Sequence, residues 1–306
     1  MLVYVGRRLV SAIPVLLIIS VLVFAIIHLI PGDPVTMIIG DQPVSAEQMD
    51  RIRTQLGLNR PLIIQYLDYV GSALHGDLGQ SIQSHLPVSQ EILRAFPHTI
   101  ALTAGSMVFA LTVGMILGVL AARWVNTMID TLSMLIVNIG VSAPTFWTGL
   151  ILIFVFAYKT RLLPMFGASG FRSLILPSVS LGFYAAATIA RIVRSSMLEV
   201  LNEEYVIVAR SKGLRESIVI YKHALRNALI PTVTMVGLMV GLFLAGAVIT
   251  ETVFTRPGIG KLLVDAILWR DYPVVQGVLL VTASCYVLAN LVVDVSYAFL
   301  DPRIRY

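Results

Sequence analysis

Six stretches of the chain lack Asp, Glu, Lys and Arg, and each is long and mostly apolar: residues 9–32, 95–122, 131–158, 173–190, 227–250 and 272–293. About 20 apolar residues cross a hydrocarbon layer of about 30 Å. Inside lipid every backbone amide must be paired within the chain, so such stretches fold as helices. The pattern predicts an all-α integral membrane protein with six transmembrane helices at about 9–30, 100–122, 132–158, 174–193, 229–249 and 274–300.

The longest polar segment separates the first two of these stretches and covers residues 31–99. Within it, Ser45 is placed to cap a helix over 46–56. Pro61 is placed to start a second helix over 61–74, because proline is favoured at the first helical position. We expect a small α-helical extracytoplasmic insert here.

A second polar segment, residues 191–226, is strongly basic. It holds Arg191, Arg194, Arg210, Lys212, Arg215, Lys222 and Arg226 against the acids Glu199, Glu203, Glu204 and Glu216. Asn202 is a suitable N-cap for a helix with Glu203 and Glu204 in its first turn, where the helix dipole favours acids. Gly213 is a suitable left-handed stop, with Arg210 and Lys212 in the last turn.

An apolar stripe after Gly213 predicts a second, amphipathic helix, carried by Leu214, Ile218, Tyr221 and Leu225. Two short helices joined by a glycine turn, held between membrane spans, are suited to dock on something outside the membrane. A basic loop that only satisfies the rule for cytoplasmic loops explains the charges equally well.

Two further local patterns lie inside the apolar stretches. Gly114 and Gly118 have the GxxxG spacing that permits close helix contact, although glycine is common enough in spans for the spacing to arise by chance. Ser142, Pro144 and Thr145 interrupt the third predicted span, where the proline is expected to kink the helix. Such a kink is a candidate for the substrate passage, and an ordinary packing kink is the alternative.

Composition agrees with a membrane protein. The chain is 57% hydrophobic and only 13% charged, with a mean hydropathy of +0.87, whereas soluble domains are about a quarter charged. The net charge of +5 comes from basic residues beside the spans, so it indicates membrane topology and not nucleic-acid binding. Lys and Arg in the short loops predict cytoplasmic N- and C-termini. The single cysteine, Cys285, excludes an internal disulfide.

Catalytic and nucleotide-binding motifs are absent from the sequence. There is no G-x-x-x-x-G-K-[ST] loop, and the five histidines are scattered, so we expect no enzyme activity, no metal site and no cofactor in this chain. The apolar stretches also lack the buried ionisable residues that gradient-driven carriers use. A conduit moved by an outside motor is favoured over a stand-alone channel or ion-coupled carrier, and a membrane enzyme is a more distant alternative.

Several motifs along the chain resemble those of the permease subunits of binding-protein-dependent ABC importers, in the dipeptide, oligopeptide and nickel group. They are Pro31-Gly32-Asp33-Pro34, Leu56-Gly57-Leu58, Gly76-Asp77-Leu78-Gly79, Glu204-Tyr205, Ala209-Arg210-Ser211-Lys212-Gly213-Leu214, His223-Ala224-Leu225-Arg226-Asn227-Ala228, Pro257-Gly258-Ile259-Gly260, Arg270-Asp271-Tyr272-Pro273 and Asp301-Pro302-Arg303-Ile304-Arg305. The family's cytoplasmic signature, E-A-A-x-x-x-G, is only partly kept. Ala209 and Gly213 match, whereas Ile207 and Val208 replace the Glu and the first Ala, which we associate with the peptide branch.

The resemblance implies a type I importer permease fold in the bacterial inner membrane. It implies a complex with a homologous second permease, two ATP-binding cassette subunits that bind ATP and Mg²⁺, and an extracytoplasmic solute-binding protein. The substrate implied is a small peptide (dipeptide, oligopeptide or glutathione), with nickel as the alternative within the family.

The resemblance also assigns residues 194–228 to a cytoplasmic coupling loop that contacts the ATPase. Its expected contact residues are Glu203, Glu204, Tyr205, Val208, Ala209, Arg210, Lys212, Gly213 and Leu214. Among them, Tyr205, Val208 and Ala209 form the expected apolar docking face, Glu203 and Glu204 cap the helix, and Gly213 sets the turn.

Overall fold

The computed structural model describes residues 2–29, 45–55, 59–168 and 170–300. In this part of the chain the elements are helices, and the one β-type pairing is an isolated bridge between Gln80 and Pro87. The predicted all-α class is therefore confirmed for the described residues. The motifs at 31–34, 56–58 and 301–305 lie outside them.

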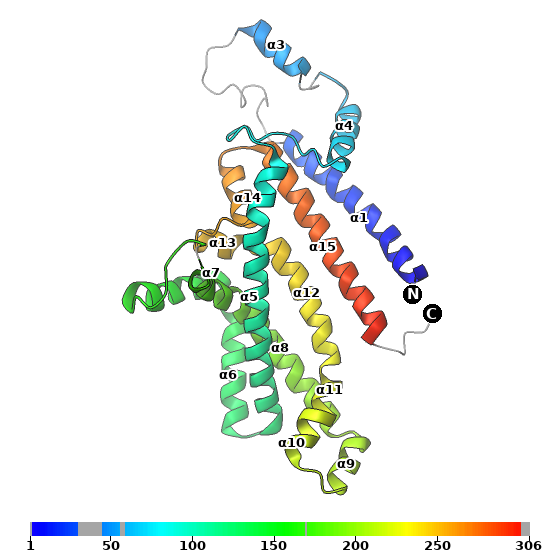
Figure 1. The fold of residues 1–306 in the computed structure, drawn as a ribbon, viewed down its shortest axis with the longest axis vertical. Helices are drawn as coiled ribbons and strands as arrows, with labels where there is room; N and C mark the ends of the chain where they lie inside the picture. The colour runs from blue at the N-terminus through cyan, green and yellow to red at the C-terminus, as the bar shows by residue number, and fades with distance from the viewer. Residues whose placement is uncertain (1, 30–44, 56–58, 169, 301–306) are drawn as a thin grey trace.

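Long helices make up the body of the molecule (Figure 1). They are α1 (Leu2–Leu29), α5 (Val88–Arg123), α6 (Met128–Ser142), α8 (Arg172–Leu201), α12 (Ile230–Gly246) and α15 (Tyr272–Leu300). α1 lies beside α15, which in turn packs on α12, while α5 packs along α8. The helices thus form a bundle with α1 at one edge.

Shorter elements gather at the two ends of this bundle (Figure 1). One end holds α9 (Glu204–Ser211) and α10 (Glu216–Ile218), which lead through the π-helix η2 (Val219–Ala224) and α11 (Leu225–Ala228) into α12. The opposite end holds α3 (Ala46–Gln55), α4 (Leu62–Leu74) and α14 (Ile259–Leu268), with α13 (Val248–Val253) below α14. α9 and α10 of the basic segment therefore lie at the opposite end from the described insert helices α3 and α4.

Three described helices are long and apolar enough to cross a membrane: Val88–Arg123, Arg172–Leu201 and Tyr272–Val292. Two bent pairs of helices, Met128–Ser142 with Thr145–Lys159 and Glu216–Ala228 with Ile230–Leu244, are each compatible with one further span. The described apolar part of α1, Val10–Ala25, is shorter.

Two of the predicted spans are longer as helices than their apolar windows. α5 begins at Val88, before the expected start at residue 100, and α8 runs on to Leu201 past the expected end at residue 193. Glu91 and Arg94 end the apolar window of α5 without ending the helix, because both residue types are good helix formers. The basic segment therefore starts as a continuation of α8.

The two insert helices, α3 and α4, begin close to the predicted residues, but the position of Pro61 differs from the prediction. The Ser45 hydroxyl accepts a hydrogen bond from the Gln48 backbone at 3.3 Å, and Gln48 Oε1 accepts one from the Ser45 N–H at 3.2 Å. This reciprocal pair is a capping box that starts α3. Pro61 occupies the N-cap of α4 and not its first helical position, with ψ of 141°.

Close contact between α5 and α8 depends on small residues. A Cβ on Gly114 would lie 2.7 Å from the Ala186 carbonyl oxygen, and a Cβ on Gly118 would lie 2.7 Å from that of Ala190. From the other side, a Cβ on Gly182 would lie 2.6 Å from the Ser106 carbonyl oxygen. The GxxxG spacing on α5 is therefore a packing feature and not a chance pattern.

Candidate functional site

The basic segment begins with the end of α8, and its first expected cap is placed differently. Asn202 follows α8 as its C-cap: its backbone N–H bonds to the Glu199 carbonyl, and its side-chain amide donates to the Leu198 carbonyl at 2.9 Å. The prediction that Asn202 starts the next helix is wrong, because its amide satisfies carbonyls left open at the end of α8. Glu203 is the N-cap of α9, without a side-chain capping bond.

Helix α9 turns one apolar face inward and another outward. Val206 and Ala209 are buried against Val219, with Val200 and Leu201 packed on them. Tyr205, Ile207 and Val208 are exposed. The expected docking face included Ala209, but its methyl group packs within the chain, so the exposed apolar face consists of Tyr205, Ile207 and Val208 instead.

The turn after α9 is closed by an ion pair and a left-handed glycine. Arg210 donates to both carboxylate oxygens of Glu216, with Nη2 2.9 Å from Oε1 and Nε 3.3 Å from Oε2. Lys212 is the C-cap of α9, and Gly213 follows with φ of +77°. Leu214 is exposed after the turn. Gly213 thus has the conformation that the sequence predicted.

The returning segment buries a different face from the expected one. Val219, Ile220, Ala224 and Ala228 are buried, whereas Leu214, Ile218 and Tyr221 of the predicted stripe are exposed. Leu214 lies before α10, which begins only at Glu216, and Ile218 is the last residue of α10 before the π-helix η2, so these residues do not share one regular helical face with Tyr221. The predicted helix is therefore present in broken form and rotated.

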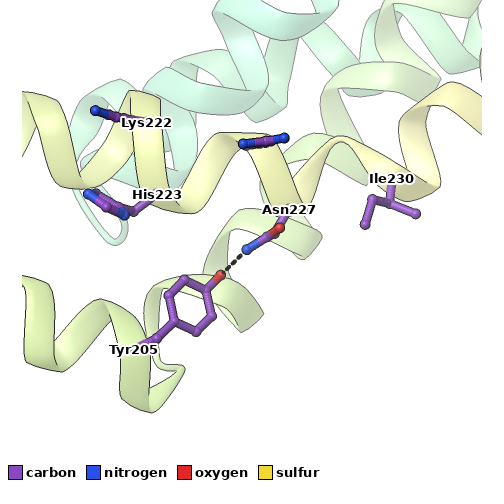
Figure 2. Close-up of a pocket in the computed structure, with 6 residues that line it drawn as sticks. Tyr205, Lys222, His223, Asn227 and Ile230 are labelled. Atoms are coloured by element: carbon purple, nitrogen blue, oxygen red, sulfur yellow. Dashed lines mark hydrogen bonds between the residues drawn. The ribbon is translucent and has the colours of Figure 1, made fainter. Parts of the chain in front are cut away.

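Between α9 and the returning segment lies a cavity of about 570 Å³, which we call the basic pocket (Figure 2). Its lining residues are Tyr205, Lys222, His223, Arg226, Asn227 and Ile230. Figure 2 shows Tyr205 and Asn227 facing each other, and the Asn227 amide donates a hydrogen bond of 2.7 Å to the Tyr205 hydroxyl oxygen. The sequence showed the charges of this segment but not that they meet in one pocket.

The proposed passage residues lie at a break between two helices. α6 ends at Ser142, Pro144 is the N-cap of α7 (Thr145–Leu152), and α7 continues into the π-helix η1 (Ile153–Lys159). The two helical halves meet at 109°. The prediction of a kink within one continuous helix is therefore wrong, because the chain bends far more sharply than a kink and the helix is broken. Thr145 is anchored by its carbonyl, which accepts a 2.9 Å hydrogen bond from the Ser180 hydroxyl.

A buried carboxylate at the opposite end of the bundle was missed by sequence reasoning. Glu251 in α13 is fully buried, and its oxygens accept hydrogen bonds from the Thr99 hydroxyl at 2.6 Å and the Gly260 N–H at 2.7 Å. A Cβ on Gly258 would collide with this carboxylate. Burial raises the pKa of the Glu251 carboxyl. These hydrogen bonds and the charge of Arg256 lower it, but the effect of burial is larger, so the pKa is raised overall. The available signal was an acid directly after an apolar stretch and before Pro257-Gly258-Ile259-Gly260.

An ion pair joins the start of α6 to the lower part of α8. Arg194 donates from Nε and Nη2 to the two carboxylate oxygens of Asp130, each at 2.8 Å, and Asp130 also accepts a bond from the Asn126 N–H. The Asp130 side chain is 8% exposed and that of Arg194 27%. This pair fixes α6 beside the helix that carries the basic loop.

Replacing Asp130 with asparagine is expected to destabilise the protein by about 3 kcal/mol, because it leaves a partly buried guanidinium without its counter-charge. Replacing Asp265, whose pair with Lys261 has a carboxylate 43% exposed, is expected to cost under about 1 kcal/mol. Thermal unfolding of the two purified variants measures the difference. Equal losses would contradict the role given to the Asp130–Arg194 pair.

Comparisons with known proteins agree with this architecture. Residues 114–306 match the family of binding-protein-dependent transport system inner membrane components, and residues 1–103 match the N-terminal membrane component of the same systems. The chain is 47% identical over 306 residues to the glutathione transport system permease protein GsiC of Escherichia coli strain K12, covering all of both chains. The Shigella boydii serotype 4 protein of that name is 46% identical, again with full coverage of both.

The chain belongs to the family of binding-protein-dependent transport system inner membrane components. It is a permease subunit of an ABC importer, in the group that contains dipeptide and glutathione permeases, and not an enzyme. The resemblance inferred from the motifs is thereby confirmed.

Proposed function

We propose that this chain forms, with a homologous second permease, the membrane passage through which a small peptide such as glutathione enters the cell. The observation that carries the choice of substrate is the identity of 47% with glutathione permeases over the whole of both chains. The match covers the whole of both chains, so it includes every segment that could form the passage.

The same proposal includes six membrane spans, with both termini and α9 in the cytoplasm and the insert outside. α1, α5, α8 and α15 each supply one span, and the two bent pairs supply the others. The basic segment 191–226 holds seven Lys and Arg residues, and it leads into α9 and α10 at one end of the bundle (Figure 1); such a surplus is the charge bias of cytoplasmic loops.

The energy for uptake comes, in this proposal, from two ATPase subunits that bind ATP and Mg²⁺, while a solute-binding protein delivers the peptide from outside. The exposed apolar face of α9, formed by Tyr205, Ile207 and Val208, is the contact with the ATPase. Closure of the ATPase dimer moves α9 as a rigid body, and the bundle then alternates between outward and inward access. Arg210, Lys212 and Leu214 flank this face around the Gly213 turn.

The break between α6 and α7 is the proposed wall of the passage. Proline has no N–H, so the bend at Pro144 interrupts the backbone ladder and leaves polar groups to face a solute. The Ser142 and Pro144 side chains are exposed in the single chain, which is the arrangement expected of residues that face a shared passage.

The function is tested by reconstituting the permease pair, the ATPase subunits and the solute-binding protein in liposomes and measuring uptake of labelled glutathione. We expect uptake that requires ATP and each partner. Uptake by this chain alone, without the ATPase, would contradict the proposal in favour of a carrier. Uptake of a metal ion such as nickel in place of glutathione would show that the substrate is a metal ion and not a peptide.

Replacing Gly213 with proline is expected to abolish ATPase co-purification while leaving the chain in the membrane. Proline fixes φ near −65°, whereas Gly213 has φ of +77° and its N–H bonds to the Arg210 carbonyl at 2.9 Å. Gly213→Asn is the matched control, because asparagine tolerates the left-handed conformation. Normal ATPase recovery with the proline variant would refute the coupling role of this turn.

A further inference from the structure

We propose that the basic pocket binds the phosphate headgroup of an anionic phospholipid from the cytoplasmic leaflet. The proposal rests on the proposed function, since that places α9 and the start of α12 on the cytoplasmic side. The pocket is about 570 Å³ and is lined by residues of α9, η2, α11 and α12 (Figure 2).

The charge of the pocket has one sign. Lys222, His223 and Arg226 contribute basic groups, and no acid is among the lining residues. Two other arginines of the same segment do have acid partners: Arg210 pairs with Glu216, and Arg194 with Asp130. Among the described residues no ion pair satisfies Lys222 or Arg226, so a negative ligand would supply the missing charge.

The neutral lining residues complete a donor set suited to phosphate. The Tyr205 hydroxyl oxygen accepts the Asn227 amide hydrogen at 2.7 Å, which leaves the hydroxyl hydrogen available to donate into the pocket. A guanidinium, an ammonium and a phenol together supply several donors to the oxygens of one phosphate group. A single carboxylate offers only two oxygens and would leave part of this donor set unused.

The position of the pocket favours a lipid as the source of that phosphate. Ile230, which lines the pocket, is the first residue of the apolar helix α12, and it is 49% exposed. Leu238 and Leu242 are also exposed farther along α12. A headgroup in the pocket would thus continue into acyl chains lying along exposed apolar side chains. Basic pockets beside cytoplasmic helix ends have this relation to anionic lipids.

The test uses the complete importer complex in nanodiscs of phosphatidylcholine with or without phosphatidylglycerol, and native mass spectrometry measures phosphatidylglycerol bound per complex. We expect Lys222→Gln and Arg226→Gln each to lower its affinity by about fivefold, since one basic residue near anionic lipid is worth that factor. Arg215→Gln is the control, because Arg215 is exposed on the same loop outside the pocket. It is expected to leave binding unchanged.

Three results would overturn the proposal. The first is equal binding of phosphatidylglycerol by all variants. The second is displacement of the lipid by added inorganic phosphate, which would make the pocket a site for the free ion. The third is loss of the ATPase from Arg226→Gln complexes in phosphatidylcholine alone, which would assign the pocket to an acidic side chain of that subunit. Failure of glutathione uptake by the wild-type complex would instead affect the proposed function, because lipid binding is measured separately.

Discussion

Replacing Gly118 with valine is expected to force α5 away from α8 and to destabilise the protein by about 3 kcal/mol. Its Cβ would lie 2.7 Å from both the Ala190 carbonyl oxygen and Val193 Cβ, and a backbone carbonyl cannot move aside as the end of a flexible side chain can. Overpacking of a filled interior costs about 1–3 kcal/mol, and a backbone obstacle favours the upper figure. The midpoint of thermal unfolding of the purified chain measures the loss.

Gly71→Val is the matched control for this substitution. Gly71 also lies inside a helix, α4, but a Cβ there meets nothing within 4 Å. The same valine should therefore change stability by only a few tenths of a kcal/mol, from helix propensity alone. A loss at Gly71 as large as the loss at Gly118 would show that helix propensity, and not the contact of α5 with α8, sets the effect.

Replacing Glu251 with alanine is expected to destabilise the end of the bundle that holds α13 and α14 by about 3–5 kcal/mol, because each buried donor left without its acceptor costs about 1–3 kcal/mol. The Thr99 hydroxyl and the N–H groups of Gly260 and Lys261 would lose their shared acceptor. Limited proteolysis between α13 and α14 reports this loss locally. Glu91→Ala, which removes a carboxylate bonded to Ser84 in an exposed position, should cost about 1 kcal/mol.

The pH dependence of stability provides a second measurement at Glu251. Burial raises the pKa of its carboxyl in the folded chain, so the folded state holds its proton to higher pH than the unfolded state does. Stability contributed by this group is therefore present below the ordinary carboxyl pKa and falls as pH rises toward the raised one. Glu251→Gln should lack this slope, and an identical slope in both proteins would contradict the assignment.

The apolar windows located the long helices but not their ends. Lipid requires apolar side chains only over its own thickness, so Glu91 at one end of α5 and Arg194 near the end of α8 gave no sign that the helices continue. The sequence also showed that Pro144 disturbs its helix. A bend of 109°, however, depends on how α7 packs on its neighbours, and a proline alone does not specify that angle.

Long-range contacts could not be predicted from spacing. Ser81 and Asp271 both lie in or beside motifs that the sequence singled out, yet only the fold joins them, by a 2.6 Å hydrogen bond from the Ser81 hydroxyl to the Asp271 carboxylate. The basic pocket is similar, because only the fold brings Tyr205 of α9 beside residues of η2, α11 and α12. Ala209 was misplaced for a related reason: a small apolar residue fits an interface and an interior equally well.

The continuity of α8 has a mechanical consequence. Its 30 residues form one helix about 45 Å long that ends at Leu201, three residues before α9 begins at Glu204. A continuous helix resists bending, so a tilt imposed at its Leu201 end is expected to carry along the helix as far as Pro177, the interior proline at which it can bend. Because glycines hold α5 close against α8, that tilt is expected to turn both helices together, with the relative displacement taken up where helices are interrupted, near Pro144 and Ala247.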